Sequence, residues 1–271
     1  MTNSPDLMTV TSWNMNHKKR AWAAIPLLGA DVVLMQEATK PVLDASSGVR
    51  LAAPPSPKWK IQNGWGAHAT GIAVTKHGVE FLQVPVTELG AAGDGEIGST
   101  HPGQFTIVKV PWGKYELTLI SLYGIFHDGF ADASLHRALS DLTPILERKS
   151  PVLIAGDLNT FRGHTLKGTA PSQGLRRHDT VFSRFAAFGL ECLGPFSSAG
   201  PLKDCPCLDG VNCTHIQTYR HMNQVDHRPF QLDFVFGSKV VQERMISCRV
   251  LDDARWWAES DHAPIEVVLG K

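Results

Sequence analysis

Five short polar clusters each close a run of apolar residues, and together they supply the groups used in phosphate chemistry with a hard cation. The clusters are residues 12–16 (SWNMN), 36–37 (QE), 156–159 (GDLN), 232–234 (LDF) and 260–262 (SDH). Each lies where a buried strand would reach the edge of a sheet. They contribute carboxylates, carboxamides and one imidazole, so we expect the fold to gather them at one pocket around a divalent ion.

Two of the clusters offer carboxylates directly after solid apolar runs. Asp157 and Asn159 follow the run 152–155, and strand geometry holds side chains two residues apart on one side, so both are expected to point into one cleft. Glu37 ends the run 32–36, where a carboxylate can bind Mg2+ or Mn2+. Taken alone, an Asp at a strand end is more often a helix cap or a turn residue.

The last two clusters offer a carboxylate and an imidazole. Asp233 lies within the largely apolar run 230–236, where a charge is costly to desolvate unless it is paired. An imidazole is a natural partner, and His262 directly precedes the last apolar run. The alternative for Asp233 is a buried structural carboxylate satisfied by hydrogen bonds.

The surrounding elements indicate an α/β fold built on two sheets. Short apolar runs predict strands at 8–13, 31–36, 71–75, 80–84, 104–110, 115–123, 152–155, 232–236, 244–250 and 264–269. Helical periodicity is confined to 19–28, 132–146 and 179–188. Strands outnumber helices and do not alternate with them, which disfavours a Rossmann sheet or a TIM barrel. Two packed sheets with helices outside, in one domain spanning 1–271, fit better.

Composition narrows the partners and the compartment. Lys plus Arg and Asp plus Glu balance at 26 each, so any attraction to nucleic acid must be local rather than global. The N-terminus lacks the basic start and unbroken apolar stretch of a secretion signal, and no run of about 18 apolar residues predicts an integral membrane segment. We therefore expect a soluble, cytoplasmic protein.

Cysteine usage agrees with a reducing compartment, because five cysteines do not make a disulfide framework. Cys205, Cys207 and Cys213 lie close to His215, which raises the possibility of a zinc site. The Cys-x-Cys spacing is not the usual Cys-x2-Cys knuckle, and a loop with buried thiols is the simpler interpretation.

Taken in order, the clusters resemble the endonuclease/exonuclease/phosphatase superfamily of exonuclease III-type and deoxyribonuclease I-like phosphoesterases. Ser-Trp-Asn, Gln-Glu, Gly-Asp-Leu-Asn and Ser-Asp-His carry the resemblance, which covers most of the chain. It implies a four-layer αββα sandwich with two central mixed β-sheets and an active site at one end of the sheets. It also implies Mg2+, or possibly Mn2+, as the cofactor.

On the metal side, the resemblance implies that Glu37 is the principal ligand. Asn14 would sit beside it and contact the metal site or the phosphate, and Asn16 falls where many relatives place a second metal-side Asp or Asn. Asp261 would assist a metal or the neighbouring His262.

For the chemical step, the resemblance implies a second set of residues. Asp157 and Asn159 would align the attacking water and hold the phosphate. His262 would be the essential imidazole, oriented by Asp233. Tyr123 falls where exonuclease III-type relatives have a Tyr and would serve the leaving oxygen. Whether the base is Asp157 or His262 stays open at this point.

The sequence constrains the substrate less than the reaction. After Tyr123 the exonuclease III group continues with a Pro and an Asn or Gln, whereas this chain has Gly124 and Ile125, which weighs against abasic-site repair. A basic segment follows the Gly-Asp-Leu-Asn turn and could track a nucleic-acid backbone, grip a polyphosphate head group, or simply face water. Its cations are Arg162, Lys167, Arg176, Arg177 and Arg184. The tryptophans Trp59, Trp65, Trp256 and Trp257 could stack on bases, although most are expected to pack in the core.

Three functions follow from these observations. The leading prediction is a Mg2+-dependent nuclease that cuts DNA or RNA phosphodiesters. A second is a phosphatase or phosphodiesterase acting on phosphoinositide, phospholipid or another small phosphoester, which predicts a membrane-facing apolar hairpin that the sequence does not show. A third is a catalytically silent scaffold, and it is disfavoured because every expected polar position is filled.

Overall fold

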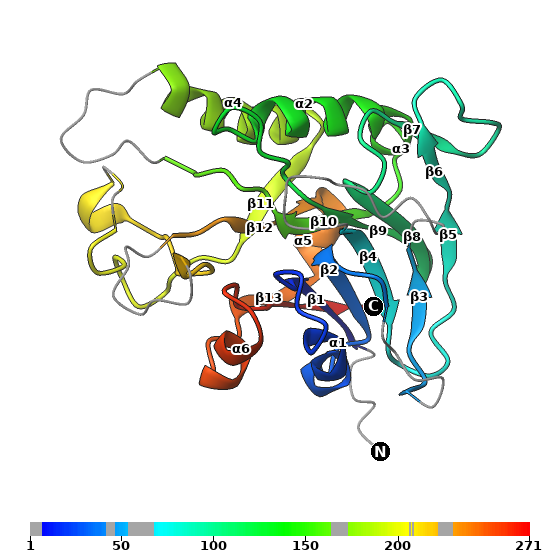
Figure 1. The fold of residues 1–271 in the computed structure, drawn as a ribbon, viewed down its shortest axis with the longest axis horizontal. Helices are drawn as coiled ribbons and strands as arrows, with labels where there is room; N and C mark the ends of the chain where they lie inside the picture. Colours follow the sequence, from blue (N-terminus) through cyan, green and yellow to red (C-terminus); the bar gives the residue numbers. More distant parts are fainter. Residues whose placement is uncertain are drawn as a thin grey trace.

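Two six-stranded β-sheets pack face to face in the computed structural model, with helices on both outer surfaces (Figure 1). The structure describes residues 7–41, 47–53, 68–163, 173–205, 207, 209–221 and 230–271. The predicted four-layer αββα sandwich is confirmed. Lys167, Trp59 and Trp65, which the sequence marked as candidate substrate contacts, lie outside the described residues.

Each sheet is mixed. The first contains, in spatial order, β13 (Met245–Val250), β14 (Ile265–Gly270), β1 (Leu7–Asn14), β2 (Val32–Ala38), β4 (Ala69–Val74) and β3 (Arg50–Ala52). The second contains β11 (Leu190–Gly194), β12 (Asp233–Ser238), β10 (Val152–Asp157), β9 (Tyr115–Leu122), β8 (Phe105–Trp112) and β5 (Leu82–Val84). Strands β1 and β2 run parallel, as do β9 and β10, and the other pairs within these two sheets are antiparallel. A separate parallel pair joins β6 (Val86–Glu88) to β7 (Ile97–Ser99).

The helices form the two outer layers. Helices α2 (Asp132–Asp141), α3 (Thr143–Leu146) and α4 (Gln173–Ala187) cover the second sheet, at the top of Figure 1. Helix α1 (Ala21–Ala24), the 3-10 helix η1 (Ile25–Leu28) and α6 (Ala254–Glu259) cover the first sheet, at the bottom. Two further short helices, η3 (Gly210–Asn212) and α5 (Lys239–Arg244), lie between strands.

The central strands are solid apolar runs because both of their faces are buried. On β10, Leu153 and Ala155 pack between the two sheets, whereas Val152 and Ile154 pack under the helices. Both faces of the strand are therefore buried, and burying each Val, Leu or Ile side chain stabilises the fold by about 1.5–3 kcal/mol.

Trp256 and Trp257 are buried on α6, so they serve packing, as expected of most tryptophans.

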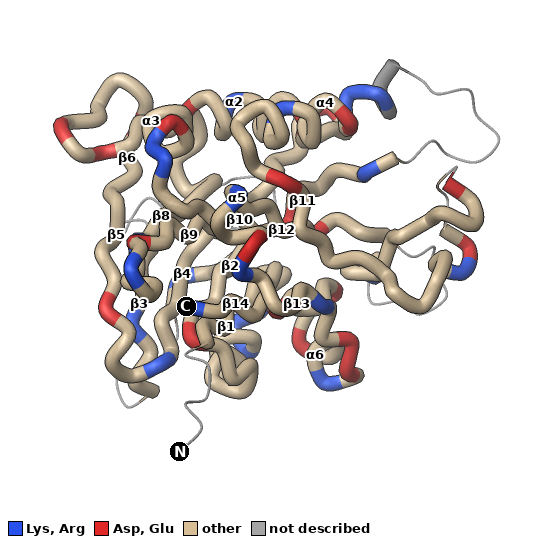
Figure 2. The backbone as a smooth tube through the Cα atoms, turned by 180° about the vertical axis from the view of Figure 1, so that it is seen from behind, with Lys and Arg blue, Asp and Glu red and all other residues tan. Residues whose placement is uncertain are grey.

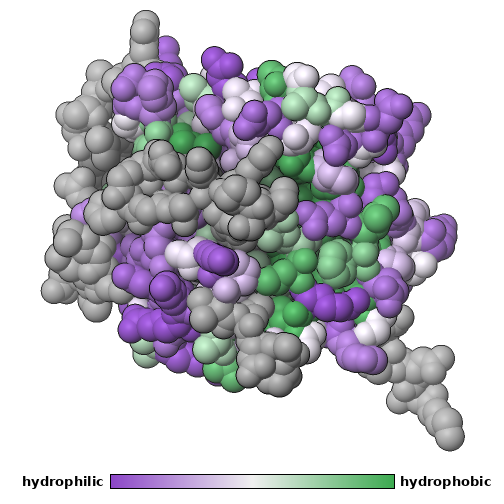
Figure 3. Space-filling model, turned by 45° about the vertical axis from the view of Figure 1, so that its right-hand side comes forward, coloured by the Kyte–Doolittle hydropathy of each residue, from purple (hydrophilic) through white to green (hydrophobic). Residues whose placement is uncertain are grey.

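The surface is mixed in character. Lys and Arg segments are interspersed with Asp and Glu segments along the described chain (Figure 2). The side of the molecule that carries β5 and β6 shows apolar surface among polar side chains (Figure 3), and Leu82 on β5 is 62% exposed. Within the described ranges, no helix has the length and apolar character needed to cross a membrane.

Candidate active site

Strand periodicity aims three polar side chains into the space between the sheets. Every second residue of β1, β10 and β12 packs in the inter-sheet core, and these series end in Asn14, Asp157 and Asp233. Asp157 and Asp233 are also direct partners in the antiparallel pairing of β10 with β12. The sandwich therefore carries a polar group at one end of each of three central strands, next to one another.

Asn14 and Asp157 meet across the two sheets. The Asn14 Nδ2 donates to Asp157 Oδ2 over 2.8 Å, and the backbone N–H of Asn159 donates to Asp157 Oδ1 over 2.8 Å. Asn14 also accepts from the backbone N–H of Asn16 over 2.8 Å. Two donors thus fix the orientation of the Asp157 carboxylate, which is itself only 1% exposed.

Glu37 reaches the same end of the molecule through a β-bulge. The pairing of β2 with β4 shifts register between Met35 and Ala38, and Glu37 has a φ of 47° in the left-handed region. Such a bulge re-aims a side chain that the regular alternation would send elsewhere. Asn16, His17 and Asn159 also have positive φ, so strained backbone is concentrated at this site.

Hydrogen bonds hold the Glu37 carboxylate in its ionised form. Tyr123 donates its hydroxyl to Oε1 over 2.8 Å, and His17 Nε2 lies 2.8 Å from Oε2. Burial alone raises the pKa of Glu37, but the hydrogen bond and charge of His17, the charge of His262 and the Tyr123 hydroxyl outweigh it and bring the pKa to about 2. Glu37 is therefore a carboxylate throughout the physiological pH range.

His262 is held by a buried carboxylate. Its Nδ1 lies 2.8 Å from Asp233 Oδ2, and its Nε2 lies 3.8 Å from Asp157 Oδ2. Burial lowers the pKa of His262, but the charges of Asp233 and Asp157 outweigh it and raise the pKa to about 10. The separation of 3.8 Å exceeds a hydrogen bond, so Nε2 can contact a group that enters between the two side chains.

Burial shifts the pKa of both cleft aspartates in the same direction. Desolvation, reinforced by the charges of Asp233 and Glu37, raises the pKa of Asp157 despite the opposing charge of His262. Desolvation likewise raises the pKa of Asp261, with Glu37 adding to it. A raised pKa makes a carboxylate a stronger base when it is ionised and lowers the fraction that is ionised at neutral pH.

Most of the residues expected at the site line a single cleft of about 590 Å³. Those residues are Asn16, Glu37, Tyr123, Asp157, Asn159, Asp261 and His262. Asn14 and Asp233 lie behind them, fully or almost fully buried, and bond to Asp157 and His262 respectively. Far-separated parts of the sequence therefore meet at one pocket.

The described arginines proposed as substrate contacts do not line the cleft. Of the described cations after the Gly-Asp-Leu-Asn turn, none is among the cleft-lining residues. Arg177 pairs with Asp132, with Nε 2.7 Å from Oδ2, and Arg162 lies over the ring of Phe196. Arg176 is exposed on α4. These positions make Arg162 and Arg176 the better candidates for contacting an extended substrate.

Several lining residues were missed by sequence reasoning. His17 and Lys18 line the cleft and directly follow the polar cluster at residues 12–16. That adjacency in the sequence was the available signal. Tyr219 comes from the loop before β12 and places its ring 4.8 Å from that of His262. The remaining newly found residues are His221, Leu232 and three phenylalanines, Phe126, Phe161 and Phe230.

Two glycines explain why the catalytic strand ends can approach so closely. A Cβ on Gly156 would overlap the carbonyl oxygen of Leu122, and one on Gly124 would overlap the carbonyl oxygen of Leu158. The backbone N–H of Gly124 donates to the carbonyl of Asp157 over 2.8 Å. Gly124, which departs from the exonuclease III pattern after Tyr123, is thus required by local packing.

The donor set fits a hard divalent cation at Glu37. The ionised carboxylate faces a cleft that also holds the oxygen-bearing side chains of Asn16, Asp157 and Asp261, which suit Mg2+. Asp157, Asp233 and His262 also bring ligand atoms within 4.8 Å of one another. Because the His262 ring bonds to Asp233 at hydrogen-bond distance, we assign that trio to orienting the imidazole.

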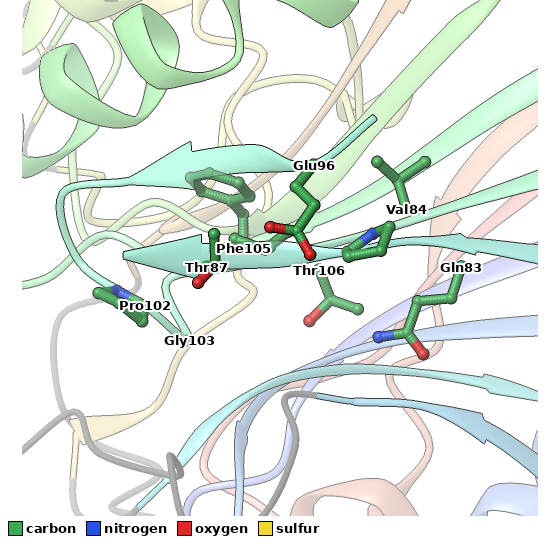
Figure 4. Close-up of a pocket in the computed structure, with 10 residues that line it drawn as sticks. Gln83, Val84, Thr87, Glu96, Pro102, Gly103, Phe105 and Thr106 are labelled. Carbon is green, nitrogen blue, oxygen red and sulfur yellow. The ribbon is translucent and has the colours of Figure 1, made fainter. Parts of the chain in front are cut away.

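A second pocket lies away from these residues, beside β5, β6 and β8 (Figure 4). Glu96 is the one carboxylate among its lining residues, and no imidazole or thiol lines it. Figure 4 shows Glu96 near Thr87 and Phe105, a setting without the paired titratable groups that hydrolysis needs. The cleft around Glu37 is the better candidate.

Solved structures share this fold, and two of those described below are endonucleases by name. The AP endonuclease LMAP from Leishmania major has a TM-score of 0.67 and 13% identity, covering 98% of this chain and 88% of that one. The endonuclease domain of TRAS1, a telomere-specific non-LTR retrotransposon, has a TM-score of 0.63 and 18% identity, covering 97% and 98%. The catalytic domain of Xenopus laevis APE2 has a TM-score of 0.62 and 15% identity, covering 97% and 93%.

A comparison with curated proteins finds no match to the chain. The sequence profile of the Endonuclease/Exonuclease/phosphatase family, in contrast, matches residues 11–262. That span runs from the strand that carries Asn14 to His262 itself, and thus includes every side chain of the cleft described above. The chain belongs to the Endonuclease/Exonuclease/phosphatase family.

Proposed function

We propose that this protein is a Mg2+-dependent nuclease that hydrolyses phosphodiester bonds of DNA or RNA, with Mn2+ as an acceptable substitute. The observation that carries the proposal is the composition of one cleft. It combines an ionised Glu37, the neighbouring side chains of Asp157 and His262, and aromatic side chains at its walls. The first two serve hydrolysis, and the aromatic walls select a nucleotide polymer.

The reaction needs charge neutralisation at the phosphate, an activated water and a stabilised leaving oxygen. Bound at Glu37, with help from Asn16 and Asp261, Mg2+ would supply the positive charge for the non-bridging oxygens. Asn14 and the N–H of Asn159 keep Asp157 oriented toward an attacking water. Tyr123, whose hydroxyl lies beside Glu37, is proposed to contact the departing oxygen.

The protonation states favour a division of labour between Asp157 and His262. The raised pKa of His262 keeps the ring an imidazolium at neutral pH, so its Nε2–H can donate to a phosphate oxygen. A protonated ring cannot take a proton from water. Asp157 is then the proposed proton acceptor, in the ionised form that the charge of His262 and the backbone N–H of Asn159 favour against burial.

Nucleic acid is the substrate class that the cleft walls fit best. Phe126, Phe161, Phe230 and Tyr219 line the cleft, and Phe126 is 51% exposed. Stacking of a base on an aromatic ring is worth about 1–3 kcal/mol and tolerates any sequence. The exposed Lys18 at the cleft edge can contact a phosphate. Arg162 and Arg176 are proposed to follow the strand beyond the cleft.

The test is cleavage of supercoiled plasmid, single strands, abasic duplex and short-chain phosphoinositide, each with Mg2+, Mn2+ or EDTA. Glu37→Gln and His262→Ala should each reduce turnover by at least about 10²-fold without unfolding the protein. Glu80→Gln and His77→Ala, which change exposed residues between β4 and β5, are the matched controls.

Two results would change the assignment. Plasmid cleavage that survives both Glu37→Gln and His262→Ala would come from a contaminant and would remove the nuclease proposal. Release of phosphate from the lipid alone would replace it with a phosphatase acting on a small phosphoester.

A further inference from the structure

A second cluster of ligand-type side chains lies outside the catalytic cleft, in the segment between β11 and β12 that is yellow in Figure 1. The thiol sulfurs of Cys205, Cys207 and Cys213 and a ring nitrogen of His215 all lie within 4.8 Å of one another. We propose that these four residues bind one structural Zn2+ that fastens this segment beside the active site. The assignment does not depend on the proposed reaction.

The distances match tetrahedral zinc. His215 Nδ1 lies 3.6 Å from Cys205 Sγ and 3.3 Å from Cys213 Sγ. A tetrahedral zinc with Zn–S of about 2.3 Å and Zn–N of about 2.0–2.1 Å separates the two ligand atoms by about 3.6 Å. Four protein ligands leave no position for water, which is the arrangement of structural rather than catalytic zinc.

The second ring nitrogen of His215 fixes which nitrogen would bind the metal. His215 Nε2 lies 2.7 Å from the carbonyl oxygen of Arg162, and a carbonyl only accepts. The proton is therefore on Nε2, and the lone pair of Nδ1 faces the sulfurs. Metal-bound histidines commonly donate their other N–H to a backbone carbonyl in this way.

The burial pattern of this segment points to a metal core rather than an apolar one. Among the described residues from 196 to 215, the buried side chains are Cys207, Cys213 and His215. Val211, the β-branched apolar residue of η3, is 87% exposed. Among its described residues the segment thus turns its ligands inward and exposes Val211, so these residues offer little hydrophobic burial to hold it.

The backbone is bent so that the four ligands converge. Asp204 and Gly210 have φ values of 59° and 54°, and the 3-10 helix η3 turns the chain back just before Cys213.

The proposed zinc lies where it can position catalytic residues. His215 is bonded to Arg162, three residues after Asn159. Three residues beyond His215, the Thr218 hydroxyl accepts from the backbone N–H of Asp233 over 3.2 Å. Loss of the metal would therefore loosen the support of the pair of Asp233 and His262, as well as the zinc segment itself.

The direct test is the metal content of the full chain, purified with a reductant and without chelator. Mass spectrometry of metals should find about one zinc per chain, as a closed four-ligand site requires. Exchange with Co2+ should give tetrahedral d–d bands and thiolate-to-cobalt charge-transfer absorption. The cobalt spectrum needs no substitution, so it is decisive even if ligand variants fail to fold.

Three variants locate the metal. Cys213→Ser should lose most of the zinc, whereas Cys248→Ser, a cysteine outside the cluster, should retain it. Glu37→Gln should also retain it, which separates this site from the catalytic cleft. The proposal is overturned by reduced wild-type protein without zinc, by Cys213→Ser with full zinc content, or by a disulfide among the three cysteines in freshly prepared protein.

Discussion

Asn14 and Asp157 join the two sheets of the sandwich through a single hydrogen bond of 2.8 Å between Nδ2 and Oδ2. Asn14 ends β1 in one sheet, and Asp157 ends β10 in the other. The Asn14 side chain is completely buried, so the bond is protected from water. One contact thus couples the packing of the sheets to the orientation of the proposed proton acceptor.

Replacing Asn14 with Ala should therefore affect stability and catalysis together. Loss of a buried partner of a carboxylate costs about 1–3 kcal/mol of the free energy of unfolding. Misplacing a reacting group by about 1 Å costs about 10²-fold in kcat, and KM should change little. Urea denaturation and steady-state kinetics measure the two effects. Unchanged kcat in a destabilised Asn14→Ala protein would show that the bond is only structural.

The charge on Asp233 should control the protonation of His262. Asp233→Asn keeps a hydrogen-bond acceptor for Nδ1 but removes the main charge that raises the pKa of His262 to about 10. We therefore expect the pKa of His262 to fall in the variant. An imidazole NMR titration measures the shift directly. Asp94→Asn, on an exposed loop, is the control and should leave the His262 titration unchanged.

The raised pKa of His262 in the folded protein also predicts how stability depends on pH. The folded-state pKa of His262 is raised from 6.5 to about 10, so its ion pairing stabilises the fold fully below pH 6.5 and is lost as pH rises through about 10. The difference in unfolding free energy between wild type and Asp233→Asn should accordingly be largest at acidic pH and shrink toward pH 10. A constant difference over that range would contradict the assigned pairing.

Much of the sandwich could be predicted from the sequence because its central strands are buried on both faces. The solid runs at 32–36 and 152–155 became β2 and β10 with small boundary changes. Strands β3, β6, β7 and β11 were not predicted. The first three have only three residues each, which is too few for a periodicity to register. Helix α4 begins at residue 173 rather than 179, and the strand expected from 244 begins at 245, after α5.

The burial of Trp256 and Trp257 depends on the type of element that carries them. Adjacent side chains point to opposite faces of a strand, so an extended segment could bury only one of the two in the same core. The segment is instead helix α6, and both side chains are buried. The short helix lacks the repeated pattern from which longer helices can be predicted.

Some residues of the candidate site could be predicted from strand periodicity, and others could not. Asp157 and Asp233 follow from strand periodicity, because they continue the inward-facing series of β10 and β12. The orientation of Glu37 depends on a bulge and a positive φ, which arise from tertiary pairing and leave no local signal. Tyr219 comes from an irregular loop, where no period marks an inward-facing residue.

Tyr123 should tune metal binding through its hydrogen bond to Glu37. Tyr123→Phe removes a donor 2.8 Å from Oε1 and leaves the ring in place. Loss of a partner that orients a metal ligand typically costs about 10- to 100-fold in metal affinity. The Mg2+ concentration for half-maximal activity should rise accordingly. Tyr115→Phe, at the opposite end of β9, is the control and should not change the Mg2+ dependence.

Gly156, the first residue of the Gly-Asp-Leu-Asn turn, should not tolerate an added methyl group. Its added Cβ would overlap the Leu122 carbonyl oxygen, a backbone atom that cannot move without separating β9 from β10. Gly156→Ala should therefore lower the free energy of unfolding by about 3 kcal/mol, at the upper end for overpacking. In Gly93→Ala the new Cβ would meet Glu96 Oε2 at 3.7 Å, an ordinary contact, so the change should stay within about 0.5 kcal/mol. Equal denaturation midpoints for the two variants would mean that β9 and β10 do not approach as closely as the sandwich requires.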